Sequence, residues 1–257
     1  MDRSHNKKLN IYTQRKAAQM ILVTGGCSFS ATKTGKYCWP HWLEKQTKFN
    51  AVNTGSGSEG NGMISRRIIH AVHKQLKHTS ADNILVGIMW SGPSRHEQYS
   101  SEKIDFNGNI DGWMENPTSY ADQDPGGWII YNNHWKIKQA QHFYRYMYDS
   151  VYSQVLTLEH IIRTQNYLKL HNIKYFMTTY MDEVFALTDN NNLDHLYEQI
   201  DYEYFLTNQG MLEWTRTTGL QPRSNGDHHP TIEMHQLYTN KIIIPWIKQK
   251  YKIDINA

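Results

Sequence analysis

Short apolar runs alternate along the chain with longer amphipathic segments. Four of the runs have the character of strands, and they lie at residues 20–23, 49–53, 84–90 and 173–179. The third run is apolar throughout, as expected of a strand that is buried on both faces. Strands that alternate with helices predict a parallel sheet with helices on both sides, so the chain is expected to fold as an α/β protein.

Amphipathic periodicity and end signals place the helices between these strands. One helix is expected to start near residue 39, where Pro40 suits a first turn. Others are expected at residues 63–76, 139–171, 193–205 and 208–217. The longest of them carries an apolar face made of Val151, Val155, Leu158 and Ile162. Thr231 suits the cap of a last helix, which Pro245 is expected to kink or interrupt.

Residues 91–138 interrupt the alternation of strands and helices. This segment is rich in Gly, Asn, Asp and Ser, and it contains Trp113, Trp128 and Trp135. Loops of this length are uncommon without a purpose, so a lid or a binding surface is expected; a small irregular insertion with a hairpin around Gly127 is the alternative. We expect residues 1–19 to form a solvated arm and residues 20–257 a single domain.

Composition narrows the class of protein. Only 39% of the 257 residues are hydrophobic, but 12% are aromatic, and 17 are tyrosines. Disordered chains contain few aromatic residues, so this chain is expected to fold. The net charge is only +3, with both signs interspersed, which argues against a dedicated nucleic-acid-binding protein.

The two cysteines and the first residues bear on the compartment. Cys27 and Cys38 are too few for a disulfide framework, which favours a reducing compartment. The first 19 residues are polar and basic, and the run at 20–23 is too short for a signal core or a membrane span. The expected location is therefore the cytoplasm, or a particle assembled in a cytoplasm, with no membrane partner.

Two separate motifs suggest nucleophilic catalysis. Ser28 follows the first apolar run directly after two glycines, at the carboxyl edge of the expected sheet and near an expected helix N-terminus. About two hundred residues downstream, a Pro-terminated turn carries Asp227, His228 and His229. A serine needs a base to remove its proton and a group to orient that base, and this turn contains both.

Other interpretations of the same residues remain open. Ser28 could be an ordinary helix cap, and the histidine turn a surface loop. Asp227, His228, His229 and His235 together could bind zinc, although no Cys or HExxH helix accompanies them. Cys27 is an alternative nucleophile, but one residue away from Ser28 it is expected to face the interior.

Three stretches resemble motifs of the SGNH/GDSL hydrolases, over roughly residues 20–247. Gly26-Cys-Ser-Phe-Ser30 is similar to the nucleophile motif of that family, with Cys27 where the family has Asp. Asn53-Thr-Gly-Ser-Gly-Ser-Glu-Gly-Asn61 resembles the second block, and Asp227-His-His-Pro230 the last. Trp39-Pro40 and Trp90-Ser91 with Arg95-x-Glu97 look like SGNH-type proteins of tailed phages.

The resemblance implies a three-layer α/β/α sandwich with a central parallel sheet of flavodoxin-like type. It also implies Ser28 as nucleophile, His229 as base and Asp227 as the group that orients the base, with His228 as a second candidate for the base. The oxyanion hole would use the N–H of Ser28 and that of Gly57, with Ser58 and Gly60 as neighbouring candidates.

The third block of the family is absent. Trp90-Ser-Gly-Pro-Ser94 stands where the family has its asparagine, so the last oxyanion donor would be Asn61 or a backbone N–H. Trp90, Ser91 and Arg95 are expected to bind substrate. Arg95 and Glu97 are expected to pair with each other or with neighbours, or Arg95 to hold a substrate carboxylate.

These expectations combine into one hypothesis and one alternative. The hypothesis is a serine esterase that uses an acyl-enzyme, acts on a small-molecule or glycan ester such as an O-acetylated carbohydrate, and needs no metal or organic cofactor. The alternative is an inactive SGNH-like structural or glycan-binding protein, virion-associated in a phage, which the missing third block keeps open.

Overall fold

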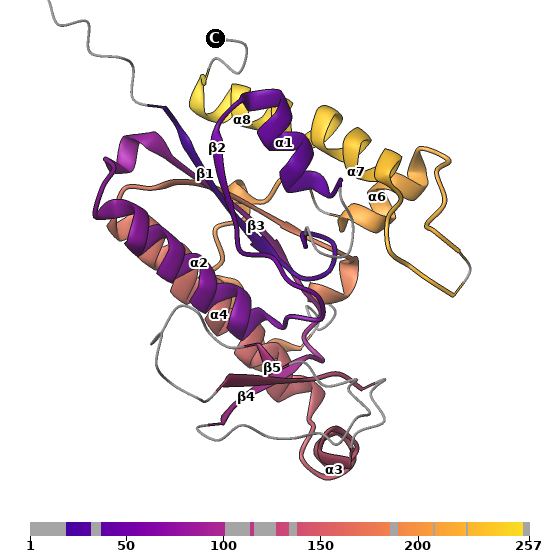
Figure 1. Cartoon of the computed structure of the whole chain (residues 1–257). Helices are drawn as coiled ribbons and strands as arrows, with labels where there is room; N and C mark the ends of the chain where they lie inside the picture. Colours follow the sequence, from indigo (N-terminus) through magenta and orange to yellow (C-terminus); the bar gives the residue numbers. More distant parts are fainter. Residues whose placement is uncertain are drawn as a thin grey trace, which may run out of the picture.

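Four parallel strands lie side by side at the centre of the structure, a computed structural model (Figure 1). They are β1 (Ile21–Gly26), β2 (Asn50–Asn53), β3 (Ile84–Trp90) and β7 (Lys174–Thr179), in the order β2-β1-β3-β7. The structure describes residues 19–31, 37–100, 114–115, 127–133, 138–185, 190–207, 209–224 and 226–253. The expected arm, apart from residue 19, and the tryptophans at 113 and 135 lie outside the described residues.

Burial on both faces explains the composition of these strands. Every residue of β3 is buried, and five of the six residues of β1 and of β7 are buried. Parallel strands covered by helices need apolar side chains on both sides, which is why the apolar runs predicted the strands almost to the residue. The expected parallel sheet is confirmed.

Helices cover both faces of the sheet, which gives three layers (Figure 1). One layer contains α2 (Asn61–Leu76) and α4 (Ser150–Leu170), which pack against each other. The other contains α1 (Trp39–Thr47), α7 (Ile232–Tyr238) and α8 (Ile244–Tyr251). The fold is therefore an α/β/α sandwich with a central parallel sheet, as expected.

The expected helix at 139–171 is wrong, because the chain forms two helices there. The first is α3 (Lys138–Tyr146), and α4 begins at Ser150. The Asp149 carboxylate accepts a hydrogen bond from the N–H of Tyr152 at 2.7 Å, which caps the new helix at its start.

The apolar face expected on this helix is also only partly right. Leu158 is buried, but Val151 is exposed. The buried residues of α4 are Gln154, Thr157, Leu158, Ile161, Thr164, Gln165 and Leu168. The stripe is partly polar because several of these side chains make hydrogen bonds with other elements, as Thr157 does with Asn61.

The helix expected at 193–205 is mostly irregular. Its only α-helical part is α5 (Asp194–Tyr197). The chain then runs beside β7, where Phe205 forms a single parallel bridge with Met177. The next helix, α6, covers Met211–Thr217. Thr231 caps α7 as expected, since its side chain accepts a hydrogen bond from Met234. Pro245 lies in the first turn of α8, after a π-helical segment (Thr239–Ile243) that joins α7 to α8 without a break.

The insertion forms a second, antiparallel sheet beyond the carboxyl end of β3. Its strands are β4 (His96–Ser100), β5 (Met114–Glu115) and β6 (Gly127–Tyr131), in the order β4-β6-β5. In Figure 1 this sheet and α3 lie below the three layers. Gly127 begins β6, which pairs antiparallel with β5, the preceding strand in the sequence, so the chain reverses direction near Gly127 as the expected hairpin requires.

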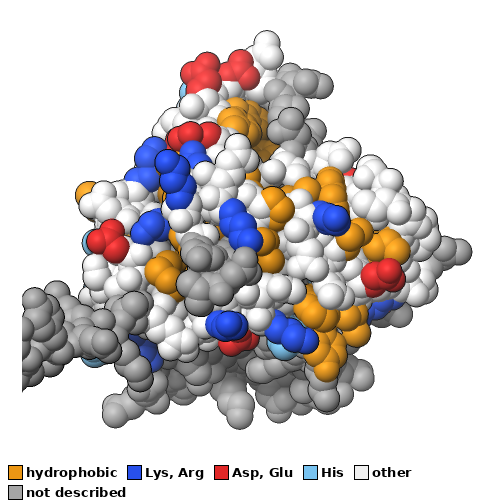
Figure 2. All heavy atoms as spheres, turned by 90° about the horizontal axis from the view of Figure 1, so that it is seen from above, with side chains coloured by type: hydrophobic (Ala, Val, Ile, Leu, Met, Phe, Trp, Pro, Cys, Tyr) orange, Lys and Arg blue, Asp and Glu red, His pale blue; other side chains and the backbone are white. Residues whose placement is uncertain are grey.

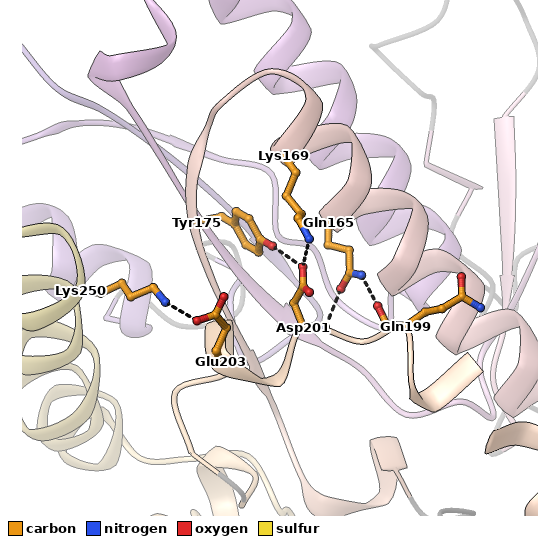
Figure 3. Close-up of polar contacts among 7 residues, drawn as sticks. All are labelled: Gln165, Lys169, Tyr175, Gln199, Asp201, Glu203 and Lys250. Carbon is orange, nitrogen blue, oxygen red and sulfur yellow. Dashed lines mark hydrogen bonds and ion pairs between the residues drawn. The ribbon is translucent and has the colours of Figure 1, made fainter. Parts of the chain in front are cut away.

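A polar network holds the irregular segment after α5 in place (Figure 3). The Asp201 carboxylate accepts hydrogen bonds from Lys169 at 2.8 Å and from the Tyr175 hydroxyl at 3.2 Å. The Gln165 side chain donates to the backbone oxygen of Gln199 and accepts from the N–H of Asp201. These contacts join α4 and the amino end of β7 to the segment, at the edge of the sheet opposite Ser28.

The surface seen from above carries charges of both signs. Figure 2 shows Lys and Arg side chains among acidic and apolar ones on this face. No helix in the described part of the chain is long and apolar enough to cross a membrane.

Candidate functional site

Ser28 lies in a tight turn at the carboxyl end of β1. Gly26 has a φ of 149°, and a Cβ there would contact Ser30 and lie 2.8 Å from the backbone oxygen of Met89, so only glycine suits this position. The N–H of Ser30 then donates to the oxygen of Cys27 at 2.8 Å. Ser28 therefore lies in a turn and not beside a helix N-terminus as expected, whereas the helix expected near residue 39 is confirmed as α1, which starts at Trp39.

The structure brings Ser28, His229 and Asp227 together in a chain of hydrogen bonds. The Ser28 Oγ lies 2.8 Å from Nε2 of His229, 201 residues away in the sequence. The other ring nitrogen, Nδ1, lies 2.5 Å from Oδ1 of Asp227. This is the order of contacts in which a carboxylate orients an imidazole and the imidazole accepts the proton of a serine.

Backbone hydrogen bonds fix the turn that carries the histidine. The N–H of Asp227 donates to the backbone oxygen of Ser224 at 3.2 Å, and Arg223 donates to the oxygen of His229 at 3.1 Å. The same Asp227 oxygen that contacts the ring accepts the N–H of His229 at 3.0 Å. The carboxylate and the imidazole are therefore held in one turn just before α7.

This arrangement stabilises the ionised form of Asp227. The backbone N–H of His229 lowers the pKa of the Asp227 carboxyl, and the His229 side chain lowers it further. The carboxylate thus stays charged to a lower pH than usual, so it can orient the imidazole across the physiological range. Both side chains are about 41% exposed, which leaves them accessible to a small substrate.

The loop after β2 lies against the end of β1 and carries Gly57. The N–H of Thr54 donates to the oxygen of Thr24 at 2.8 Å, and the N–H of Ser56 donates to the oxygen of Gly26 at 3.1 Å. Gly57 therefore directly follows Ser56, which is bonded to Gly26, the last residue of β1 before the turn that contains Ser28. Its neighbour Ser58 has a φ of 63°, so the backbone turns sharply at this point.

An ion pair that the sequence did not reveal holds this loop. The Glu59 carboxylate, 1% exposed, lies 2.8 Å from the Arg67 guanidinium, which also donates to the backbone oxygen of Thr54 at 2.9 Å. Arg67 therefore joins both ends of the loop to α2. No sequence signal could have revealed this pair, because a contact between a loop and a helix has no regular spacing.

Asn61 does not match its predicted role. Its side-chain NH₂ donates to the backbone oxygen of Ser91 at 2.8 Å and to the Thr157 hydroxyl at 3.1 Å. Its oxygen accepts the N–H of Ser91 at 2.8 Å. The prediction of an oxyanion donor is therefore wrong for this arrangement, because both amide hydrogens already join β3 and α4 to α2.

Replacing Asn61 should reveal that structural role. We expect Asn61→Ala to lower the free energy of unfolding by about 2–4 kcal/mol, because it leaves two buried backbone groups of Ser91 without partners. Urea unfolding followed by circular dichroism measures the change, with Asn192→Ala, at an exposed position, as the control. A loss no larger than that of the control would contradict the role.

Of the three residues predicted to bind substrate, two are in the core. Trp90 and Ser91 are fully buried, so the prediction is wrong for both: β3 continues to Trp90, and Ser91 lies under α2. Arg95 is half-buried and donates to the backbone oxygen of Glu59 at 3.0 Å. It does not pair with Glu97, whose nearest cation is Arg66, at 3.8 Å.

Two aromatic rings link Arg95 to the histidine. The Arg95 guanidinium lies 5.4 Å from the centre of the Tyr180 ring, which packs edge-on against Phe29. The Phe29 ring lies 5.5 Å from that of His229. Tyr180 was missed in the sequence, although its place directly after β7 put it at the same edge of the sheet as Ser28.

The alternative sites lose support. Cys27 is fully buried and faces the interior, as expected. Among the described residues no group of three or more Cys, His, Asp or Glu could hold a metal ion. His229 uses both ring nitrogens for Ser28 and Asp227, and His228 points instead toward Arg216, 3.4 Å away.

His235, another member of the suggested zinc set, lies buried in α7. Burial lowers its pKa to about 3, with smaller contributions from Arg223 and His229. A buried neutral histidine binds its proton more weakly in the folded state than in the unfolded state, so the free energy of unfolding falls as the pH drops below about 6.5.

Replacing His235 by glutamine should make the free energy of unfolding depend less on pH. Between pH 6 and pH 5 we expect the wild type to lose about 1 kcal/mol more of its free energy of unfolding than His235→Gln does. Urea unfolding at the two pH values measures the difference. His78→Gln, on the exposed turn after α2, is the control and should keep the wild-type slope; equal slopes for all three proteins would refute the prediction.

Comparisons with known proteins identify a family but no activity. No curated protein matches the chain. Among solved structures, a protein from Desulfitobacterium hafniense DCB-2 assigned to the lipolytic G-D-S-L family aligns at 11% identity and a TM-score of 0.45, over 86% of this chain and 97% of that one. A family model matches residues 30–256, which include Asp227 and His229 and begin two residues after Ser28. The chain belongs to this family, a family of unknown function (DUF6071).

Proposed function

We propose that the protein is a serine hydrolase of the SGNH type that cleaves an ester through an acyl-enzyme. The observation that carries the proposal is the contact between Ser28 Oγ and His229 Nε2, continued from His229 Nδ1 to Asp227. Three side chains from two distant segments meet in the order that nucleophilic catalysis requires. The similarity of their motifs to those of SGNH/GDSL hydrolases agrees with this function.

The geometry suggests how the steps would proceed. Ser28 Oγ attacks the carbonyl carbon while His229 Nε2 accepts its proton, and Asp227 stabilises the imidazolium that results. His229 returns the proton to the leaving alcohol as the tetrahedral intermediate collapses to the acyl-enzyme. Water, deprotonated by the same histidine, then attacks the acyl group and releases the acid and the free Ser28.

The oxyanion would be stabilised by backbone N–H groups. We assign the N–H of Ser28, in the turn, and that of Gly57, in the loop fixed beside β1, to this role. Such donors contribute about 3–4 kcal/mol each to the transition state in enzymes of this kind. The ion pair of Glu59 with Arg67 would keep the Gly57 loop in position between turnovers.

We propose an acyl group that is short and an alcohol that is polar, with an O-acetylated carbohydrate as the preferred substrate class. Arg95, joined to the site through Tyr180 and Phe29, would contact the polar part of the substrate. The proposed reaction needs no metal ion or organic cofactor.

Covalent labelling tests the proposal directly. The wild type is treated with a fluorophosphonate probe and digested, and the labelled peptide is identified by mass spectrometry. We expect the label on Ser28, and we expect hydrolysis of p-nitrophenyl acetate that persists with EDTA present. No label on Ser28 together with no hydrolysis of acetyl esters would refute the function.

A glycan-binding or structural protein with the same fold, virion-associated in a phage, is the second candidate. One observation favours it: Asn61, the expected third oxyanion donor, is held by Ser91 and Thr157 and is not available. Absence of labelling and turnover in a folded protein would make this candidate the working assignment.

A further inference from the structure

The insertion contains a second pocket, away from the serine and histidine contacts. The pocket has a volume of about 470 Å³, within the range of small-molecule sites. It lies between the antiparallel sheet and α3, the elements below the three layers in Figure 1. Its lining residues are His96, Gln98, Tyr131, Lys138, Gln139, His142, Phe143 and Met147.

Ring contacts and hydrogen bonds fix the walls of this pocket. The His96 ring of β4 stacks on the Phe143 ring of α3 with 4.2 Å between their centres and 12° between their planes. The Tyr144 hydroxyl lies 2.6 Å from the backbone oxygen of Ser94 and 2.9 Å from that of Tyr131. The ring stacking and these hydrogen bonds therefore fix α3 against the small sheet and define the space between them.

The lining combines an apolar floor with polar groups at the rim. Buried Tyr131 and half-buried Phe143 form the apolar floor, whereas Met147, Gln98 and Lys138 are exposed. The Tyr131 hydroxyl donates to the Gln98 side-chain oxygen at 3.2 Å, which leaves the NH₂ of that amide on the side away from Tyr131. An occupant thus meets apolar surface beneath it and hydrogen-bond donors around it.

The charge of the pocket selects the class of ligand. Lys138 lines it, and no carboxylate is among the described residues that do. Burial, together with Arg66, lowers the pKa of His96, so this ring stays neutral near pH 7. A cation is disfavoured, an anion is favoured by Lys138, and a wholly apolar ligand would leave the amides at the rim without partners.

We propose that this pocket binds an acidic saccharide, in which a pyranose ring packs on the apolar floor and a carboxylate pairs with Lys138. A pyranose ring has faces of C–H groups and an equator of hydroxyls, which matches an apolar floor with an amide rim. The proposal does not depend on ester hydrolysis, because none of the lining residues is Ser28, His229 or Asp227.

Calorimetry with two tetrasaccharides of equal length tests the proposal. The probes are tetragalacturonic acid and the neutral cellotetraose, each titrated into the full chain. We expect saturable binding of the acidic probe, at least about fivefold tighter than that of the neutral one, and weaker at higher salt. Equal affinity for both probes, or no saturable binding of either, would overturn the proposal.

Variants assign the binding to this pocket. We expect Phe143→Ala to weaken binding of the acidic probe about tenfold or more, through loss of the apolar floor. Lys138→Gln is a surface change that cannot unfold the core, and it should weaken the acidic probe while leaving the neutral one unchanged. Tyr152→Ala, an aromatic residue 59% exposed on α4 and outside the pocket, is the matched control. If Lys138→Gln binds the acidic probe like the wild type, the proposal is wrong.

A parallel titration of Ser28→Ala separates this proposal from the proposed function. We expect that variant to bind the acidic probe with the wild-type affinity, because Ser28 does not line the pocket. A wild-type protein that binds the acidic probe but hydrolyses no ester would leave the saccharide proposal intact and refute only the hydrolase.

Discussion

Ser28→Ala should reduce the hydrolysis of p-nitrophenyl acetate by about 10⁴-fold or to the background rate. The variant lacks the oxygen that attacks the carbonyl, and removal of a nucleophile leaves only the contribution of the oxyanion donors and of substrate binding. Initial rates at pH 8 with EDTA present measure the effect, with protein concentration matched by absorbance.

Two controls make this result specific. Ser80→Ala changes an exposed serine on the turn before β3 and should keep the wild-type rate. The Ser28→Ala protein should also unfold at the wild-type urea concentration, because the Ser28 hydroxyl contacts a histidine that is half-exposed. A Ser28→Ala protein that hydrolyses the ester within threefold of the wild type would exclude Ser28 as the nucleophile.

His229→Ala should lower kcat/KM by a similar factor, about 10⁴-fold. Without the imidazole, the Ser28 proton has no acceptor at 2.8 Å, and the leaving alcohol has no proton donor. Because the variant opens a space beside Ser28, added imidazole should restore part of the activity. The measurement is the rate of ester hydrolysis as a function of imidazole concentration.

The neighbouring histidine is the matched control for this result. His228→Ala removes the same side chain one residue earlier, where the ring faces Arg216 and not Ser28. We expect its kcat/KM to stay within about threefold of the wild type. Equal losses in the two variants would show that the turn as a whole is required and that His229 has no special part, contrary to the proposed mechanism.

The strands and the order of the site residues follow from local patterns. A run such as Ile84–Trp90 is apolar because both of its faces are buried. Burial can therefore be predicted from the residue types of a short segment alone. Gly25 and Gly26 mark the end of β1, so the sequence alone predicts that Ser28 lies at the carboxyl edge of the sheet. Parallel strands end at one edge, which is why a turn after the last strand could be expected beside it.

Contacts between distant segments were not predictable in the same way. Asn61 is the candidate for the oxyanion donor of the missing third block, but its amide is used by Ser91, directly after β3, and by Thr157 of α4. The resemblance pointed to Trp90 and Ser91 at the carboxyl end of β3 as substrate contacts, yet both side chains are fully buried. Periodicity continues through Asp149, although this residue lies outside both helices and caps the start of the second.

By itself the sequence determined the parallel sheet, its helical layers, and the choice of Ser28, Asp227 and His229 as the residues to examine, because apolar periodicity and turn residues act over a few positions of the chain. Only the tertiary structure decided that these three side chains meet within hydrogen-bond distance, that Asn61 supports the core, and that α3 and the small sheet enclose a separate pocket. Such distances depend on how elements pack, and packing is a property of side chains from many parts of the chain at once.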